Sequence, residues 1–157
     1  MPINPLIFIA QAFYASLVDD LKCSPPCYVR IIRLFRECKD GFSGIACGRV
    51  EVEINNAIDI EFIEGQLLLN LFTWESCKKL VSSVVVVVRR IQAPSRDVET
   101  TTKWNKIKNE LDNGTVIDHP RIFVNALKFM MECLSLAHID AANARCVGDF
   151  AIFCVFF

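Results

Sequence analysis

The stretch "RIFVNALKFMMECLSLAHIDAANA", residues 121–144, carries the repeating pattern that decides the fold class. Its apolar residues recur every three or four positions: Phe123, Leu127, Met130, Leu134, Ala137 and Ala141. Polar residues form a second line: Arg121, Asn125, Lys128, Glu132 and Ser135. Because this spacing matches the turn of an α-helix, it predicts an amphipathic helix that begins after Asp118, with Pro120 near its start.

The same spacing indicates two helices toward the N-terminus. Apolar residues fall on one face of a helix over residues 6–22. Ser24 is then expected to cap a second helix with Pro25 as its first residue, and Gly41 and Gly44 to close it. A connection this short predicts that the two helices are antiparallel neighbours.

The middle of the chain gives two conflicting signals. Residues 49–56, "RVEVEINN", alternate apolar and charged side chains like a strand, but no convincing partner strand exists, so we expect a helix. Residues 66–92 contain no glycine or proline and are expected to form one long helix. Five consecutive valines within it favour a strand. That preference is only about a few tenths of a kcal/mol per residue, which packing against other helices can override.

That long helix is expected to end at a corner formed by residues 93–97, "APSRD". Pro94 cannot continue a helix, whereas Ser95 could cap the next one with Asp97 near its positive end. The next helix should run to the turn signal at Asn113–Gly114. The sequence therefore predicts an all-α protein, an antiparallel bundle of about five to six helices.

Composition narrows the function classes. The 157 residues fit one domain, and a net charge of −1 implies no nucleic-acid-binding surface. A cation-rich segment is interleaved with carboxylates, which predicts a solvated helix face: Arg30, Arg33, Arg36, Glu37, Lys39 and Asp40. No apolar run approaches the roughly 20 residues that span a bilayer. Eight scattered cysteines predict reduced, mostly buried thiols of an intracellular protein, cytoplasmic or nuclear.

No group of residues amounts to an active site. Cys23 and Cys27 could begin a zinc site, but no second pair lies at a matching distance, and His119 and His138 stand alone. Phosphate-binding loops and hydrolase motifs are absent. We therefore expect no enzyme activity, no cofactor and no metal.

Two tryptophans, Trp74 and Trp104, flank the corner in sequence. They could stack on a partner, but packing of the corner against the bundle is the favoured interpretation.

Three segments in order resemble the T-complex protein 11 family: residues 13–42, residues 91–104 and the helix quoted first. Five of these residues stand in the place of the family's corner motif: Ala93, Pro94, Ser95, Arg96 and Asp97. In the last helix Ile139, Asp140 and Asn143 are in register with the family. Two departures are Gln92, where the family usually has cysteine, and the missing acidic residue before the second helix.

The resemblance implies an all-helical protein without recognised catalytic residues, linked to cyclic-AMP and protein kinase A signalling. We therefore expect a non-enzymatic helical regulator or scaffold with protein partners. The alternative is a membrane-peripheral protein that uses its first helix or its Phe-rich tail, with Arg30, Arg33 and Lys39 at lipid head groups. Ser95 and the threonines at 100–102 are weaker candidates for phosphorylation.

The resemblance divides the chain into residues 1–146, a partial family domain, and residues 147–157, "VGDFAIFCVFF". The tail matches nothing expected of the family, so we interpret it as a premature end, for instance translation into an intron. The chain would then be half of a larger helical domain, and its exposed apolar surface would favour self-association.

Overall fold

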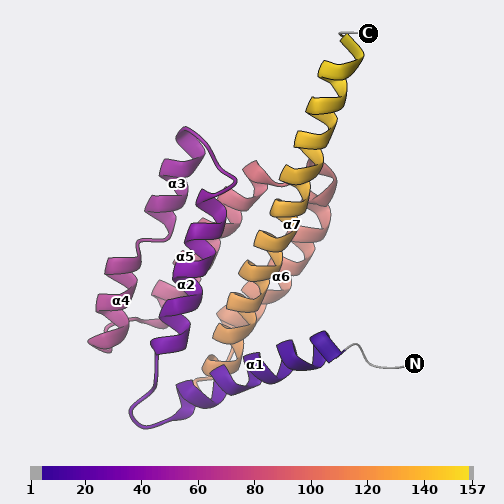
Figure 1. The fold of residues 1–157 in the computed structure, drawn as a ribbon. Coiled ribbons are helices and arrows are strands. Elements are labelled where there is room, and N and C mark those ends of the chain that lie inside the picture. The colour runs from indigo at the N-terminus through magenta and orange to yellow at the C-terminus, as the bar shows by residue number, and fades with distance from the viewer. Residues whose placement is uncertain (1–4, 156–157) are drawn as a thin grey trace.

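The computed structural model describes the backbone of residues 5–155 and the side chains of residues 8–145. The backbone forms seven α-helices and one short 3-10 helix: α1 (Pro5–Lys22), α2 (Val29–Ser43), α3 (Arg49–Ala57), α4 (Ile60–Leu68), α5 (Trp74–Ile91), η1 (Pro94–Arg96), α6 (Asp97–Asn113) and α7 (His119–Val155). No strand occurs between residues 5 and 155, which confirms the all-α bundle. Figure 1 shows α1 crossing one end of the bundle, and α3 and α4 on one side of it.

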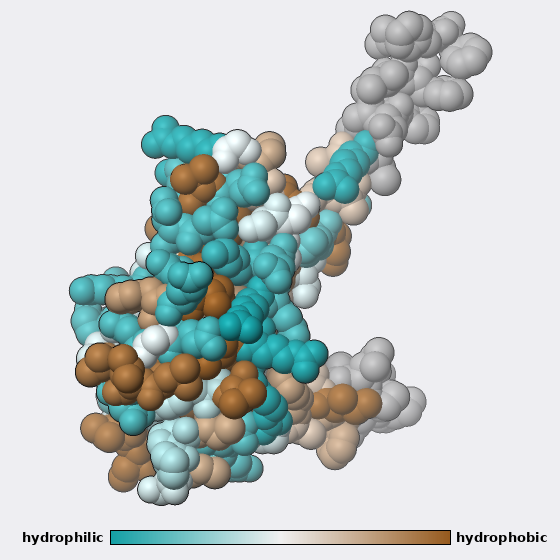
Figure 2. Space-filling model, turned by 60° about the vertical axis from the view of Figure 1, so that its left-hand side comes forward, coloured by the Kyte–Doolittle hydropathy of each residue, from teal (hydrophilic) through white to brown (hydrophobic). Residues whose placement is uncertain are grey.

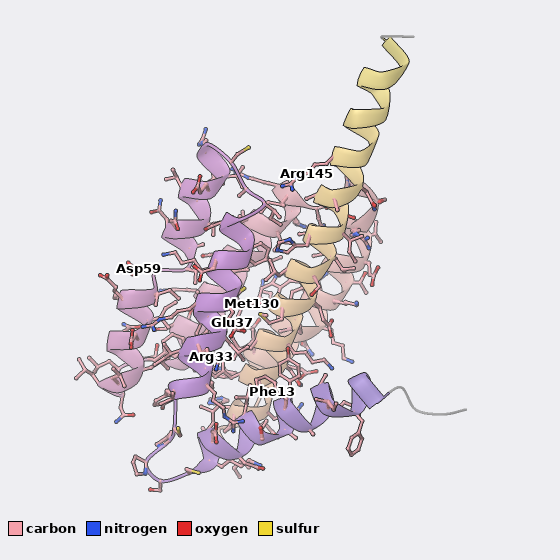
Figure 3. The ribbon with its side chains drawn as sticks, in the orientation of Figure 1. Phe13, Arg33, Glu37, Asp59, Met130 and Arg145 are labelled. Atoms are coloured by element: carbon pink, nitrogen blue, oxygen red, sulfur yellow. The ribbon has the colours of Figure 1, made fainter. Side chains whose placement is uncertain are left out.

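The core is built around α7, which packs against α1, α2, α5 and α6. Five of the six residues in its predicted apolar line are at most 7% exposed: Phe123, Leu127, Met130, Leu134 and Ala137. The sixth, Ala141, is half-buried, and the predicted polar line is exposed except for the half-buried Lys128. Figure 3 shows Met130 within the bundle. The period of the sequence therefore fixed both faces of this helix correctly.

The segment His119–Arg145 of α7 is also long and apolar enough to cross a membrane, with a mean hydropathy of 1.4 over its best window. This differs from the expectation that no apolar run approaches that length. However, 56% of that window is buried inside the fold. A core helix meets the same criteria of length and composition, because it too must be apolar on most of its surface.

The valines at 84–88 are helical despite their preference for strands. Val84, Val85, Val87 and Val88 are at most 6% exposed, and Val86 faces solvent. Burial on helical spacing thus outweighs the local preference. Residues 49–57 are helical as well, because α3 buries Ile54 and packs against α2 and α5 instead of pairing with another strand.

The expected continuous helix over residues 66–92 is wrong, because the chain breaks between α4 and α5. Asn70 has a positive φ of 53°, a left-handed conformation that asparagine adopts more readily than most residues. Thr73 then caps α5, its hydroxyl accepting a hydrogen bond from the Ser76 amide at 3.1 Å. A break in a helix therefore needs neither glycine nor proline.

Two predicted helix caps are also wrong. α2 begins only at Val29, because Pro26 disfavours a helical conformation at Pro25 and so prevents Ser24 from starting the helix. Ser95 lies within η1, and α6 follows Arg96 without a side-chain cap. The other predicted ends agree with the structure, since Gly44 follows α2 and Gly114 follows α6.

Candidate functional site

The corner motif, residues 93–97, joins α5 to α6 and is fastened to α7 by one carboxylate. Asp140 on α7 accepts a hydrogen bond from the Ala93 amide at 2.9 Å. Both of its oxygens also lie 2.9 Å from Nε of Arg96. The Asp140 side chain is only 10% exposed, and that of Arg96 is 27% exposed. Two residues of the motif therefore share a single, largely buried partner.

A second set of hydrogen bonds closes the corner on its own side. Gln92 is 7% exposed, and its amide nitrogen donates to the Asp97 carboxylate at 2.6 Å. Its amide oxygen accepts from the hydroxyl of the buried Thr100 at 2.8 Å. The resemblance places a cysteine at this position. In this chain Gln92 occupies it and makes two hydrogen bonds. Pro94 and Ser95 remain exposed.

The electrostatics of Asp140 follow from these contacts. Burial by itself would raise the pKa of its carboxyl, but the Ala93 amide and the Arg96 guanidinium together hold that pKa below the usual 3.8. Asp140 is therefore charged at neutral pH and serves as an acceptor. The corner motif is a joint between three helices.

The opposite end of α5 carries a different joint, and it is here that Trp74 lies. Trp74 packs against α6 and α7 at this end of α5, and not at the corner that it precedes in sequence. Its indole stacks on His119 with ring centroids 3.8 Å apart and planes within 6°. Its Nε1 donates to the carbonyl oxygen of Leu111 at 2.7 Å. The start of α5, the end of α6 and the start of α7 meet at this point.

The cysteines divide into two groups. Cys38, Cys77 and Cys133 are buried, and burial raises the pKa of each thiol to about 12, so they are protonated at neutral pH. Cys23, Cys27 and Cys47 are exposed, so the expectation of mostly buried thiols holds for half of these six. Among the side chains of residues 8–145, no three His, Cys, Asp or Glu residues form a group that could hold a metal ion.

The arginines of α2 each meet a carboxylate, as their interleaved charges predict. Arg30 pairs with Asp20 of α1 at 2.6 Å. Arg36 pairs with Glu64 of α4, also at 2.6 Å. Arg33 lies one turn from Glu37 on the same helix, at 3.0 Å (Figure 3). Two of these guanidinium groups connect helices and the third lies on an exposed surface. Each has an anionic partner.

An exposed apolar surface along α4 and the connection after it was not predicted from the sequence. Four large side chains are 59–69% exposed and form what we call the α4 apolar patch: Phe62, Leu68, Leu69 and Leu71. Figure 2 shows hydrophobic side chains gathered low on the face that it presents. The signal was Asn70 within the run "LLLNLF", because the break that it permits turns leucines toward solvent instead of the core.

The sequence model of the T-complex protein 11 family matches residues 8–146, which is most of the chain. The match includes the corner motif, Gln92 and Asp140, and it leaves residues 147–157 outside. No curated protein and no solved structure shows a significant match. On the strength of the family match, the chain belongs to the T-complex protein 11 family.

Proposed function

We propose that this chain is a non-enzymatic helical interaction module that acts as a regulator or scaffold in signal transduction. The observation that carries the proposal is the α4 apolar patch, whose four large side chains are each more than half exposed. Covering one such side chain stabilises a complex by about 1.5–3 kcal/mol before the costs of association. Exposed apolar patches are typical of protein-binding sites.

The patch favours an amphipathic helix of a partner protein as its occupant. Phe62 and Leu69 lie seven residues apart, which is the spacing at which apolar residues of one helix meet those of another. The exposed Asp59 and Glu61 lie beside Phe62 at the start of α4, so basic residues flanking the apolar face of the partner would complement this part of the rim. The partner is intracellular, cytoplasmic or nuclear, in this proposal.

The family resemblance implies a link to cyclic-AMP signalling, and the first test therefore uses purified regulatory and catalytic subunits of protein kinase A. Calorimetry should detect binding of one subunit to the wild-type chain. Leu68→Ser combined with Leu69→Ser should weaken that binding at least tenfold, equivalent to about 1.4 kcal/mol.

A matched control replaces two exposed residues of the α6–α7 connection, Val116→Ser and Ile117→Ser, which are 79% and 87% exposed. This variant should keep the wild-type affinity. Equal loss in both variants would contradict a role for the α4 apolar patch, and absence of binding by either subunit would remove the kinase link. Sedimentation separates partner binding from self-association, because a patch that joins two copies would give a dimer of the wild type and of the control, but not of the Leu68→Ser/Leu69→Ser variant.

One observation favours membrane-peripheral binding as a second candidate. Phe8, Ile9 and Phe13 are 37–65% exposed on α1, whose first turns project beyond the other helices (Figure 1). Such a surface could enter the head-group region of a bilayer. Flotation with anionic liposomes should recover the wild type and lose the Phe8→Ser/Ile9→Ser variant; wild-type protein left at the bottom of the gradient would exclude this candidate. The side chains of the Phe-rich tail lie outside the described residues.

A further inference from the structure

A groove of about 450 Å³ lies between α5 and α6, on a different surface from the α4 apolar patch. We call it the α5–α6 groove. The residues that matter for its chemistry are Lys78, Lys79, Ser82, Ser83, Trp104 and Lys108. Glu75, Leu111 and Asp112 complete the lining, so three amines, two hydroxyls and an indole ring lie beside two carboxylates.

One lysine of the groove is already used to hold the two helices together. Lys78 of α5 lies 3.0 Å from Glu75 of its own helix and 3.3 Å from Asp112 of α6. Hydrogen bonds to Glu75 and then Asp112 raise the pKa of its amine. Both carboxylates of the groove therefore lie against Lys78, which links α5 to α6.

The other polar groups of the groove have no partner among the side chains that the structure describes. Lys79 and Lys108 make no ion pair there, and Ser82, Ser83 and the Trp104 indole make no side-chain hydrogen bond within residues 8–145. Two lysines, two serines and Trp104 thus line one groove without such partners. A ligand that complements them must supply anionic acceptors.

The register places the two unpaired amines at different points along the groove. Lys108 lies one turn before Asp112, so in antiparallel helices it faces the segment one turn after Lys78. Lys79 is adjacent to Lys78, which offsets the two amines by about 5 Å, one helical turn. Trp104 lies one further turn along α6. The order along the groove is therefore amine, amine, aromatic ring.

We propose that the α5–α6 groove binds an acidic peptide segment of a partner protein, with two carboxylates one turn apart and an apolar side chain following. The carboxylates pair with Lys79 and Lys108, and the apolar side chain covers the half-buried Trp104 ring. Two amines offset along a groove match two spaced carboxylates better than a single phosphate group. This inference rests on the proposed interaction function and places a second contact outside the α4 apolar patch.

The test measures fluorescence anisotropy of a labelled peptide of about three helical turns, with two glutamates one turn apart and a leucine one turn later. The wild type should bind it saturably, and more weakly as salt rises. The same peptide with glutamine for glutamate should bind at least about tenfold more weakly. No saturable binding of the glutamate peptide, or equal binding of the two peptides, would overturn the proposal.

Two charge-matched variants locate the site. Lys79→Glu/Lys108→Glu reverses the charge at both unpaired lysines of the groove. Lys22→Glu/Lys106→Glu makes the same change of net charge at exposed lysines outside it. The groove variant should lose at least about tenfold in affinity, and the control should stay within about twofold of the wild type. Equal losses would mean non-specific attraction and would overturn the site.

A third variant tests the aromatic part of the groove and separates this proposal from the preceding one. Trp104→Leu should weaken the glutamate peptide several-fold, and unchanged affinity would remove Trp104 from the site. Leu68→Ser/Leu69→Ser should bind the peptide as the wild type does, since the α4 apolar patch is not part of the groove. Circular dichroism of each variant checks that the helices remain folded.

Discussion

The two ends of α5 are held to α6 and α7 by different chemistry. At the first end Trp74 stacks on His119 and donates to the Leu111 carbonyl, so the joint relies on aromatic area and a neutral acceptor. At the last end the charged Asp140 holds Ala93 and Arg96. The same three helices are thus joined once by packing and once by charge. The second joint depends on the charge of Asp140 and should weaken in acid.

The largest effect is expected at the aromatic joint. Trp74→Ala removes the stacked ring and leaves the Leu111 carbonyl without its donor, and we expect a loss of about 3 kcal/mol in the free energy of unfolding. Urea denaturation measures it. Trp74→Phe keeps an aromatic ring but not the N–H and should lose about 1 kcal/mol. Equal losses in both variants would show that the hydrogen bond, and not the ring, holds this end.

A slightly smaller loss is expected at the charged joint. Asp140→Ala leaves the Ala93 amide and the Arg96 guanidinium without their acceptor, which should destabilise the fold by about 2 kcal/mol at neutral pH. Asp140→Asn keeps the shape of the side chain but removes its charge, so it separates the effect of the charge from that of the geometry. Combining Asp140→Ala with Arg96→Ala should show coupling of about 1 kcal/mol, and strictly additive losses would contradict the pairing.

Acid should distinguish the two joints. The folded pKa of Asp140 lies below its usual 3.8, so its contribution to stability is present above that pH and is lost as pH falls through the folded value. The gap in stability between wild type and Asp140→Asn should therefore shrink between about pH 5 and pH 3, whereas the gap for Trp74→Phe should stay nearly constant. Denaturation across this range measures both gaps. If the difference in stability between wild type and Asp140→Asn did not change with pH, it would contradict the charged state of Asp140.

The smallest effect is expected where this chain departs from its family. Gln92→Cys introduces the residue that the resemblance implies at this position, but it leaves the buried Thr100 hydroxyl and the Asp97 carboxylate without a partner. The free energy of unfolding should fall by about 1 kcal/mol. Adding Thr100→Val removes the stranded hydroxyl and should recover part of the loss. Thermal unfolding measures both variants. An unchanged Gln92→Cys variant would mean that water replaces the lost hydrogen bonds.

The sequence predicted best the helices that show a regular spacing of apolar residues. α7, the helical valine run and the end of α6 follow from apolar spacing and from Asn113–Gly114. The break after Leu68 escaped notice because it depends on the conformation of Asn70 and on a hydroxyl cap at Thr73, and both residues also occur inside helices. Apolar spacing favoured one continuous helix, whereas the conformation of Asn70 and the Thr73 cap divide it.

The candidate sites divide in the same way. The corner motif was identified from its residues, but its hydrogen bond to Asp140 joins positions 47 residues apart, so only the fold reveals what holds the motif. The stacking of Trp74 on His119 also joins residues far apart in the sequence, so it too is visible only in the fold. The α5–α6 groove depends on the register set by Lys78 and Asp112, which no pattern within either helix records.

The packing of α1 on α7 has a consequence for how the chain is made. α1 ends at Lys22, and α7, against which it chiefly packs, begins at His119. A ribosome adds about 5–20 residues per second, so about 5–20 s separate the emergence of α1 from the start of its main partner. During that interval Leu17, which is fully buried in the finished fold, has no α7 to cover it. Although α1 is synthesised before the other helices described here, it is among the last to find its place, and a chaperone would meet it uncovered.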